Sequence, residues 1–218
     1  MFDHPVQRLV ADVVSWRSSA GLSRRGTPLP VIGEQARQYL TTVLRLNVPL
    51  PEFEVAERHY RYPAHTVHVT VANVGRTSTS LVTALERLSG SGLAPVTLRL
   101  YGLGCSPDTI FIRVLYDRSF VRLRNAVRRA FDVPTGPSRS VRGLPYSAMA
   151  FANVIRFDGA GERPPRNMSI WGTATIDTME IVLTDRVLSD EGTQVLASIN
   201  LRGARSGRAG GRAGRGSA

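Results

Sequence analysis

The sequence predicts an α+β protein in which antiparallel strands alternate with amphipathic helices, and three observations predict this class. Residues 62–74 combine β-branched and aromatic residues with apolar residues alternating about polar ones, which is typical of a strand. Residues 81–88 and 117–131 have apolar residues at helical spacing behind Ser, Thr or Asp caps. Residues 96–101 and 109–115 are strand-like and flank a loop that contains glycine, as in a hairpin.

The composition of the 218-residue chain, with 42% hydrophobic and 21% charged residues, is that of an ordinary soluble globular protein. The net charge is +11 and every basic residue is an arginine, so the surface favours polyanionic partners such as nucleic acid. No segment is apolar enough to span a bilayer and the N-terminus lacks a signal pattern, so we expect a cytoplasmic protein. The single cysteine, Cys105, excludes an intramolecular disulfide and is interpreted as structural. The four histidines are scattered, so we expect neither a metal nor a cofactor.

Taken in order, the first fifty residues predict helices. Residues 5–17 and 33–46 have apolar residues at helical spacing, and a loop rich in Ser, Gly and Pro separates them. We therefore assign residues 1–52 to an N-terminal helical segment. Residues 53–60 are expected to form a strand that leads into the strand at 62–74.

The last part of the chain predicts two more strands and a closing helix. The strands are expected at 146–157 and 173–184, and the helix from Ser189 to about Ile199. Residues 53–200 then form one domain. Residues 201–218 consist of Arg, Gly, Ala, Ser and Leu, have almost nothing to bury and are expected to be disordered.

His68 and Thr70 lie two residues apart on the strand at 62–74, so their side chains share one face. An imidazole can move a proton while a neighbouring hydroxyl donates a hydrogen bond to an oxygen, which suits work on a phosphate. Taken alone, the pair is better explained as a partly buried histidine that is hydrogen-bonded within a sheet. His65 is expected on the opposite face, at the surface or packed in a lobe.

The motif His68-Val69-Thr70 resembles the His-x-Thr signature of the 2H phosphoesterases, the superfamily of the 2′-5′ RNA ligase-like proteins and cyclic phosphodiesterases. The order of elements from residue 53 to 199 is similar to theirs, although the opening strand of that family is not apparent. The resemblance implies a duplicated two-lobed fold with antiparallel sheets flanked by helices around a central cleft. It also implies a metal-free reaction, in which each lobe contributes one histidine for proton transfer and one hydroxyl for phosphate oxygens.

The second motif implied by this resemblance has no histidine. By a shared Ala-Asn-Val, the second histidine falls at Ala148 and its hydroxyl at Ala150, and by the frequent Pro-His opening it falls at Tyr146. Residues 146, 148 and 150 share one strand face. Losing one proton carrier lowers the rate by about 10²–10⁴ unless another group replaces it. We favour a phosphate-binding cleft with weak or no catalysis over a site in which His68 is the base and Tyr146 the acid.

Three functions remain open from the sequence: a phosphodiesterase acting on RNA 2′,3′-cyclic phosphate or 2′-5′ linkages, a non-catalytic module that binds RNA or a nucleotide, and a protein-interaction scaffold. An Arg-Gly tail binds RNA through phosphate contacts or serves as a solubilising end. The expected catalytic residues are His68, Thr70 and Tyr146. The candidate phosphate ligands, each equally well explained as a surface residue, are Arg113, Arg156 and Asn153. The arginines of the helix at 117–131, expected to point mostly outward as a solvated face, are Arg118, Arg122, Arg124, Arg128 and Arg129.

Overall fold

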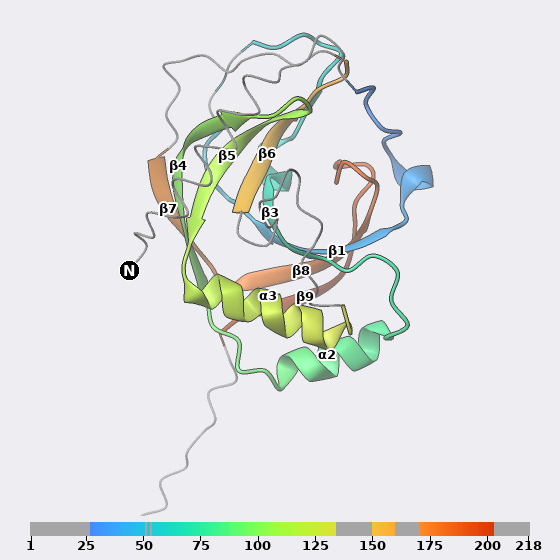
Figure 1. Cartoon of the computed structure of the whole chain (residues 1–218), viewed down its shortest axis with the longest axis vertical. Coiled ribbons are helices and arrows are strands. Elements are labelled where there is room, and N and C mark those ends of the chain that lie inside the picture. Colours follow the sequence, from blue (N-terminus) through green and yellow to red (C-terminus); the bar gives the residue numbers. More distant parts are fainter. Residues whose placement is uncertain (1–26, 51, 53, 134–149, 160–170, 203–218) are drawn as a thin grey trace, which may run out of the picture.

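The computed structural model describes residues 27–50, 52, 54–133, 150–159 and 171–202, and it contains two antiparallel sheets and two α-helices in this part of the chain (Figure 1). One sheet has the strand order β3-β1-β8-β9 and the other β2-β6-β5-β4-β7. The strands are β1 Tyr39–Arg45, β2 Tyr60–Arg61, β3 His68–Asn73, β4 Val96–Cys105, β5 Thr109–Tyr116, β6 Ala150–Arg156, β7 Trp171–Ile176, β8 Thr178–Thr184 and β9 Gln194–Asn200. The helices are α2 Leu81–Ser89 and α3 Arg118–Ala130, with 3₁₀ turns η1 Glu34–Ala36 and η2 Ala64–Thr66.

The two helices and the hairpin form where the sequence predicts them. The Ser80 hydroxyl accepts from the Thr83 amide (3.1 Å) at the start of α2, and the Asp117 carboxylate accepts from the Ser119 amide (2.8 Å) at the start of α3. The predicted hairpin is confirmed as the antiparallel pair β4 and β5. Helix α2 packs against α3, and α3 packs against β3, β4 and β5, so that the helices form a layer at one end of the sheets (Figure 1).

The helix predicted over residues 33–46 is wrong, because residues 39–45 form strand β1 in the middle of the first sheet. Its apolar residues fall at spacings of three and four, as on a helix, because both faces of this central strand are covered. Val43 and Leu44 point to opposite faces and both are fully buried. Residues 39–45 therefore belong to a sheet rather than to a separate helical segment.

Three other predicted elements also differ. The closing helix is wrong, because residues 194–200 form strand β9 and the Ser189 hydroxyl binds Asp185 instead of capping a helix. The strand predicted over 53–60 does not form over residues 54–59, and a two-residue strand, β2, begins only at Tyr60. The single strand predicted over 173–184 is divided at Asp177 into β7 and β8, which lie in different sheets.

The apolar core includes residues of both sheets and the buried side chains of helix α3. The first sheet contributes Val69 and Val71 from β3, and the second contributes Ile112 from β5 and Ala152 from β6. Residues of β3 alternate in direction, so His68 and Thr70 lie on the face opposite Val69 and Val71.

Some expectations fall outside the part of the chain that the structure describes. These are the helix at 5–17, the residues Tyr146 and Ala148, and the tail from residue 203 onward. Within the described ranges, no helix has the length and apolar character needed to cross a membrane.

Candidate functional site

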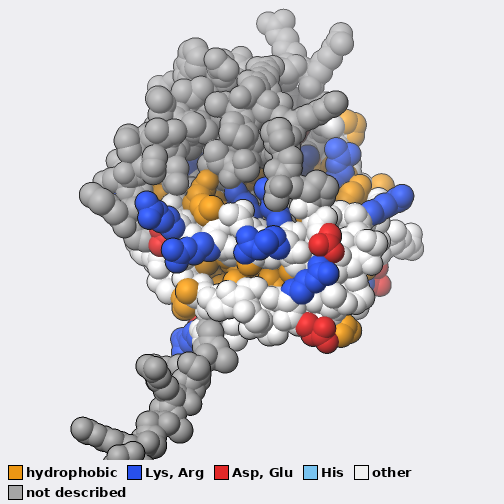
Figure 2. Space-filling model, turned by 60° about the horizontal axis from the view of Figure 1, so that its bottom comes forward, with side chains coloured by type: hydrophobic (Ala, Val, Ile, Leu, Met, Phe, Trp, Pro, Cys, Tyr) orange, Lys and Arg blue, Asp and Glu red, His pale blue; other side chains and the backbone are white. Residues whose placement is uncertain are grey.

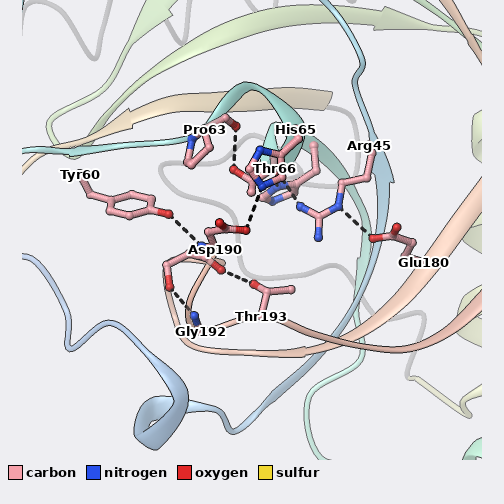
Figure 3. Close-up of polar contacts among 11 residues, drawn as sticks. Arg45, Tyr60, Pro63, His65, Thr66, Glu180, Asp190, Gly192 and Thr193 are labelled. Atoms are coloured by element: carbon pink, nitrogen blue, oxygen red, sulfur yellow. Dashed lines mark hydrogen bonds and ion pairs between the residues drawn. The ribbon is translucent and has the colours of Figure 1, made fainter.

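The site is built around His68, the first residue of strand β3. The chain enters β3 through the turn η2, which follows Pro63 and is closed by a bond from the Thr66 hydroxyl to the Pro63 carbonyl (2.8 Å; Figure 3). His68 is 4% exposed, and its Nδ1 lies 2.8 Å from the Thr66 carbonyl oxygen. A carbonyl oxygen only accepts, so Nδ1 carries the proton and Nε2 holds the free lone pair.

Burial lowers the pKa of His68 to about 4, with the bond to the Thr66 carbonyl opposing this effect and the positive charge of Arg45 adding to it. The imidazole is therefore neutral at neutral pH. In this form His68 can take up a proton at Nε2, but it cannot serve as the initial proton donor. The hydrogen bond at Nδ1 and the lowered pKa together leave Nε2 unprotonated at neutral pH.

Arg45 lies beside His68 on strand β1, where the two residues are partners in the antiparallel register. Its Nη1 donates to the Thr66 carbonyl (2.8 Å), and its Nε donates to Glu180 (2.9 Å; Figure 3). The Thr66 carbonyl thus accepts from both Arg45 and His68. Nothing in the local sequence marks Arg45, because the contact depends on strand pairing across more than twenty residues.

Tyr62 packs edge-on against His68, with ring centroids 6.1 Å apart. Its hydroxyl donates to the Val187 carbonyl (2.5 Å) and accepts from the side-chain amide of Asn153. Burial raises the pKa of Tyr62, so the phenol stays protonated and holds one wall of the site in place. The Oδ1 atom of Asn153 is buried and has no hydrogen-bond partner in the described part of the chain.

Thr70 is half-buried and points to the same face of β3 as His68. Its hydroxyl makes no hydrogen bond to any described residue, so it can donate to an oxygen of a ligand. His65 lies on turn η2, is largely exposed, and its Nε2 pairs with Asp190 (3.2 Å; Figure 3). The expectation that His65 lies at the surface is confirmed, but His65 lies on a 3₁₀ turn and not on the opposite face of the strand.

The three candidate phosphate ligands lie on one face of the second sheet. In the pairing of β5 with β6, Asn153 lies opposite Phe111, Phe151 opposite Arg113, and Arg156 opposite Thr109. The register shifts between Ile110 and Phe111, and this irregularity turns Arg156 to the same face as Asn153. Asn153 reaches Tyr62, so this face is turned toward His68. The Arg113 guanidinium lies over the Tyr101 ring at 5.0 Å, and Arg156 lies 4.0 Å from Asp108.

Ala150 lies on the other face of β6, in the apolar core with Ala152. The alignment of Ala150 with Thr70 by the shared Ala-Asn-Val is therefore wrong, because the two residues point to different sides of their strands. On β6 the residues turned toward His68 are Phe151 and Asn153. Tyr146 is outside the described residues.

Ligands for a metal ion are not gathered in the described ranges, where no three or more His, Cys, Asp or Glu side chains come together. The chemistry of the site rests on one imidazole, hydroxyl groups, amides and guanidinium groups.

No protein-family model and no curated protein matches the chain. Solved structures do match it, and the similar ones include a Thermus thermophilus protein with a TM-score of 0.55 and 19% identity, covering 76% of this chain and 98% of that chain. A structure described as a phosphoesterase has a TM-score of 0.54 and 17% identity, with coverage of 76% and 99%. Apo LigT of E. coli has a TM-score of 0.51 and 18% identity, with coverage of 76% and 98%.

The chain shares the fold of the 2H phosphoesterases. The two-lobed α+β fold inferred from the His68 motif is thereby confirmed, and at these identities the likeness establishes the fold alone. The 2H-like fold also accounts for strand β1, which is the opening strand that the sequence did not reveal. His68 and Thr70 lie on β3, an edge strand of the first sheet that lies beside β6 of the second sheet (Figure 1).

Proposed function

We propose that the chain binds and slowly hydrolyses phosphoester ends of RNA or nucleotides, such as a 2′,3′-cyclic phosphate, with His68 as the base. The observation that carries the proposal is the state of His68. Its Nδ1 proton is held by the Thr66 carbonyl and its pKa is about 4, so Nε2 is a free proton acceptor at neutral pH. The hydroxyl of Thr70, which makes no hydrogen bond to a described residue, lies on the same strand face and would hold a phosphate oxygen.

In the proposed reaction, water attacks phosphorus and His68 Nε2 takes its proton while one P–O bond to the ribose breaks. The leaving ribose oxygen then needs a proton. His68 cannot supply the first one because it starts unprotonated, so a second group must act as the acid. Tyr146 remains the proposed acid, and a site that lacks an effective acid is expected to be slow.

Two solved neighbours support the ligand class. LigT of E. coli has been solved with 3′-AMP and with phosphate, each at a TM-score of 0.50 to this chain. A phosphate or a nucleotide is therefore a reasonable first ligand for the face that carries His68, Thr70 and Asn153. RNA with a phosphoester end is the larger substrate that the basic composition favours.

The test is the hydrolysis of a 2′,3′-cyclic mononucleotide and of a short RNA ending in a cyclic phosphate, with and without a metal chelator. His68→Ala is expected to lower the rate by about 10²–10⁴, and Tyr146→Phe by a smaller factor, since each removes one proton carrier. His65→Ala is the matched control, because this histidine is exposed and pairs with Asp190. A rate that falls equally in His65→Ala and His68→Ala would contradict the proposal.

The alternative is a binding module without turnover. It is favoured by one specific observation, which is that His68 is already neutral and buried and the described part of the site shows no proton donor of suitable pKa beside it. The same assay distinguishes the two functions. No turnover, together with nucleotide binding that weakens in His68→Ala, would make the chain a phosphate-binding protein.

A further inference from the structure

Helix α3 carries an unusual charge pattern, with five arginines and no acidic residue between Arg118 and Ala130. One of these arginines, Arg124, turns inward. Its Nε donates to the Val71 carbonyl (2.8 Å), and its guanidinium lies 4.5 Å from the centre of the Phe120 ring. The other four arginines have no ion pair with any described residue, and three of them are exposed.

The three exposed arginines, Arg118, Arg122 and Arg129, form one row along the helix. Their positions fall within about 40° of each other around the axis and extend over about 16 Å along it. Figure 2, which looks at the helical end of the molecule, shows basic side chains in a row across this face. We call these three residues the α3 arginine row.

Among the described residues, no acidic side chain forms an ion pair with this row. Asp117 is engaged at the N-terminus of α3, where it accepts from the Ser119 amide. Asp132, beyond the C-terminus, binds Arg87 (2.9 Å) and the Thr79 hydroxyl. Like charges four residues apart destabilise a helix, so the row lowers the stability of α3. A partner that carries several negative charges would relieve this repulsion.

A membrane surface does not fit this helix. Binding in a bilayer interface requires an exposed apolar face beside the basic one. The apolar side chains of α3, which include Phe120, Leu123 and Val127, are buried in the core, and Val121 is the one large hydrophobic of this helix that is exposed. A nucleic acid backbone does fit, because it presents phosphates at regular intervals and is gripped by arginine without any apolar contact.

We propose that the α3 arginine row binds the phosphate backbone of an RNA whose phosphoester end occupies the His68 site. This inference rests on the proposed function for the identity of the end that is bound. Helix α3 packs directly on strand β3, and Arg124 joins the helix to the residue after Thr70. His68 and Thr70 point to the face of β3 opposite Val71, and β3 is an edge strand of its sheet, so a flexible single strand that passes around this edge can contact both the row and the site.

The test measures the binding of a labelled single-stranded RNA as a function of salt, for the wild type and for the triple variant Arg118→Gln/Arg122→Gln/Arg129→Gln. Glutamine keeps a similar helix propensity, so the fold is expected to persist, and circular dichroism checks it. The slope of log K against log salt is expected to fall by about 0.7 for each phosphate that is no longer bound, and thus by about 2 in the triple variant. Turnover of a cyclic mononucleotide, which is too small to reach α3, reports on the cleft separately.

The control is the single variant Arg186→Gln, whose RNA affinity is compared with that of the single variant Arg122→Gln. Arg186 is exposed in the loop between β8 and β9 and has no ion pair with any described residue, so each variant removes one unpaired charge. An equal loss of RNA affinity in both, or an unchanged salt slope in the triple variant, would overturn the proposal. The proposal would also be overturned if the protein bound phosphatidylserine vesicles instead of RNA and the triple variant lost this binding. RNA binding needs no turnover, so a failure of the proposed hydrolysis is seen independently.

Discussion

At the scale of single residues, His68 shows how burial selects one protonation state. An exposed imidazole would be partly protonated near neutral pH, but His68 is almost inaccessible to water and its pKa falls to about 4. The Thr66 carbonyl fixes the tautomer at the same time. Desolvation therefore keeps this histidine neutral, and one backbone hydrogen bond leaves Nε2 as its unprotonated nitrogen.

This lowered pKa predicts how stability depends on pH. As pH falls, the unfolded chain binds a proton at this residue near pH 6.5, whereas the folded chain does so only near pH 4. The stability that depends on neutral His68 is therefore complete above about pH 6.5 and is lost as pH falls toward about 4. The difference between the pKa values of His68 in the unfolded and folded chain corresponds to about 3 kcal/mol of unfolding free energy.

Urea denaturation of the wild type and of His68→Asn, each at about pH 7 and about pH 4.5, measures this contribution. Asparagine does not titrate, so the wild type is expected to lose more stability than the variant between the two conditions. The same loss in both proteins would mean that His68 is not the buried neutral group described here.

At the scale of elements, each of the two strands that the sequence misassigns as a helix carries a misleading local signal. Strand β1 is covered on both faces, so its apolar residues do not alternate and imitate a helix. Strand β9 follows Ser189, a residue typical of helix caps, but that hydroxyl is used by Asp185. Helices α2 and α3 and the β4–β5 hairpin were predicted correctly because their caps, apolar stripes and turn are local signals.

The residues of the candidate site also fall into two groups, those with a local sequence signal and those without one. His68 and Thr70 could be predicted from one strand, since their spacing alone places them on one face. Arg45 and Tyr62 could not, because their contacts with Thr66, His68 and Asn153 arise from pairing between distant strands. The buried position of Arg124 was missed for the same reason, since the Val71 carbonyl that it binds belongs to another element.

The loop between β8 and β9 depends on the buried carboxylate of Asp185. This group accepts from the backbone amides of Gly33 (3.1 Å), Val187 (2.9 Å) and Ser189 (3.1 Å), and from the Ser189 hydroxyl. Gly192 approaches so closely that any larger residue would overlap the carboxylate. The loop in turn supplies the Val187 carbonyl that holds Tyr62 beside His68.

Asp185→Asn is therefore expected to destabilise the protein by about 3 kcal/mol, because the amide nitrogen of asparagine cannot accept from these donors. Asp190→Asn in the same loop is the control and should change stability by less than about 1 kcal/mol, since the pair of this exposed carboxylate with His65 is at the surface. Thermal or urea unfolding measures both variants. Equal effects would show that the Asp185 network does not hold the loop.

At the scale of the whole molecule, two groups of arginines in the sequence are not among the residues assigned to the site. One is the α3 arginine row on the folded body. The other is the segment 203–218, whose four arginines are not balanced by any acidic residue. Two basic regions that contact different phosphates of one RNA would contribute independently to affinity and to its salt dependence.

Deleting residues 203–218 is therefore expected to weaken RNA binding and to reduce the salt slope by about 0.7 for each phosphate that is no longer bound. Turnover of a cyclic mononucleotide should not change, because the chemistry is assigned to the His68 strand. A full-length variant with the four arginines replaced by serine separates charge from chain length. If that variant binds RNA as the wild type does, the segment is a solubilising end. If the serine variant instead binds RNA as weakly as the deletion does, the charge of the segment matters. If its loss of log K also adds to that of the triple α3 variant when the two are combined, both regions bind the same RNA at separate phosphates.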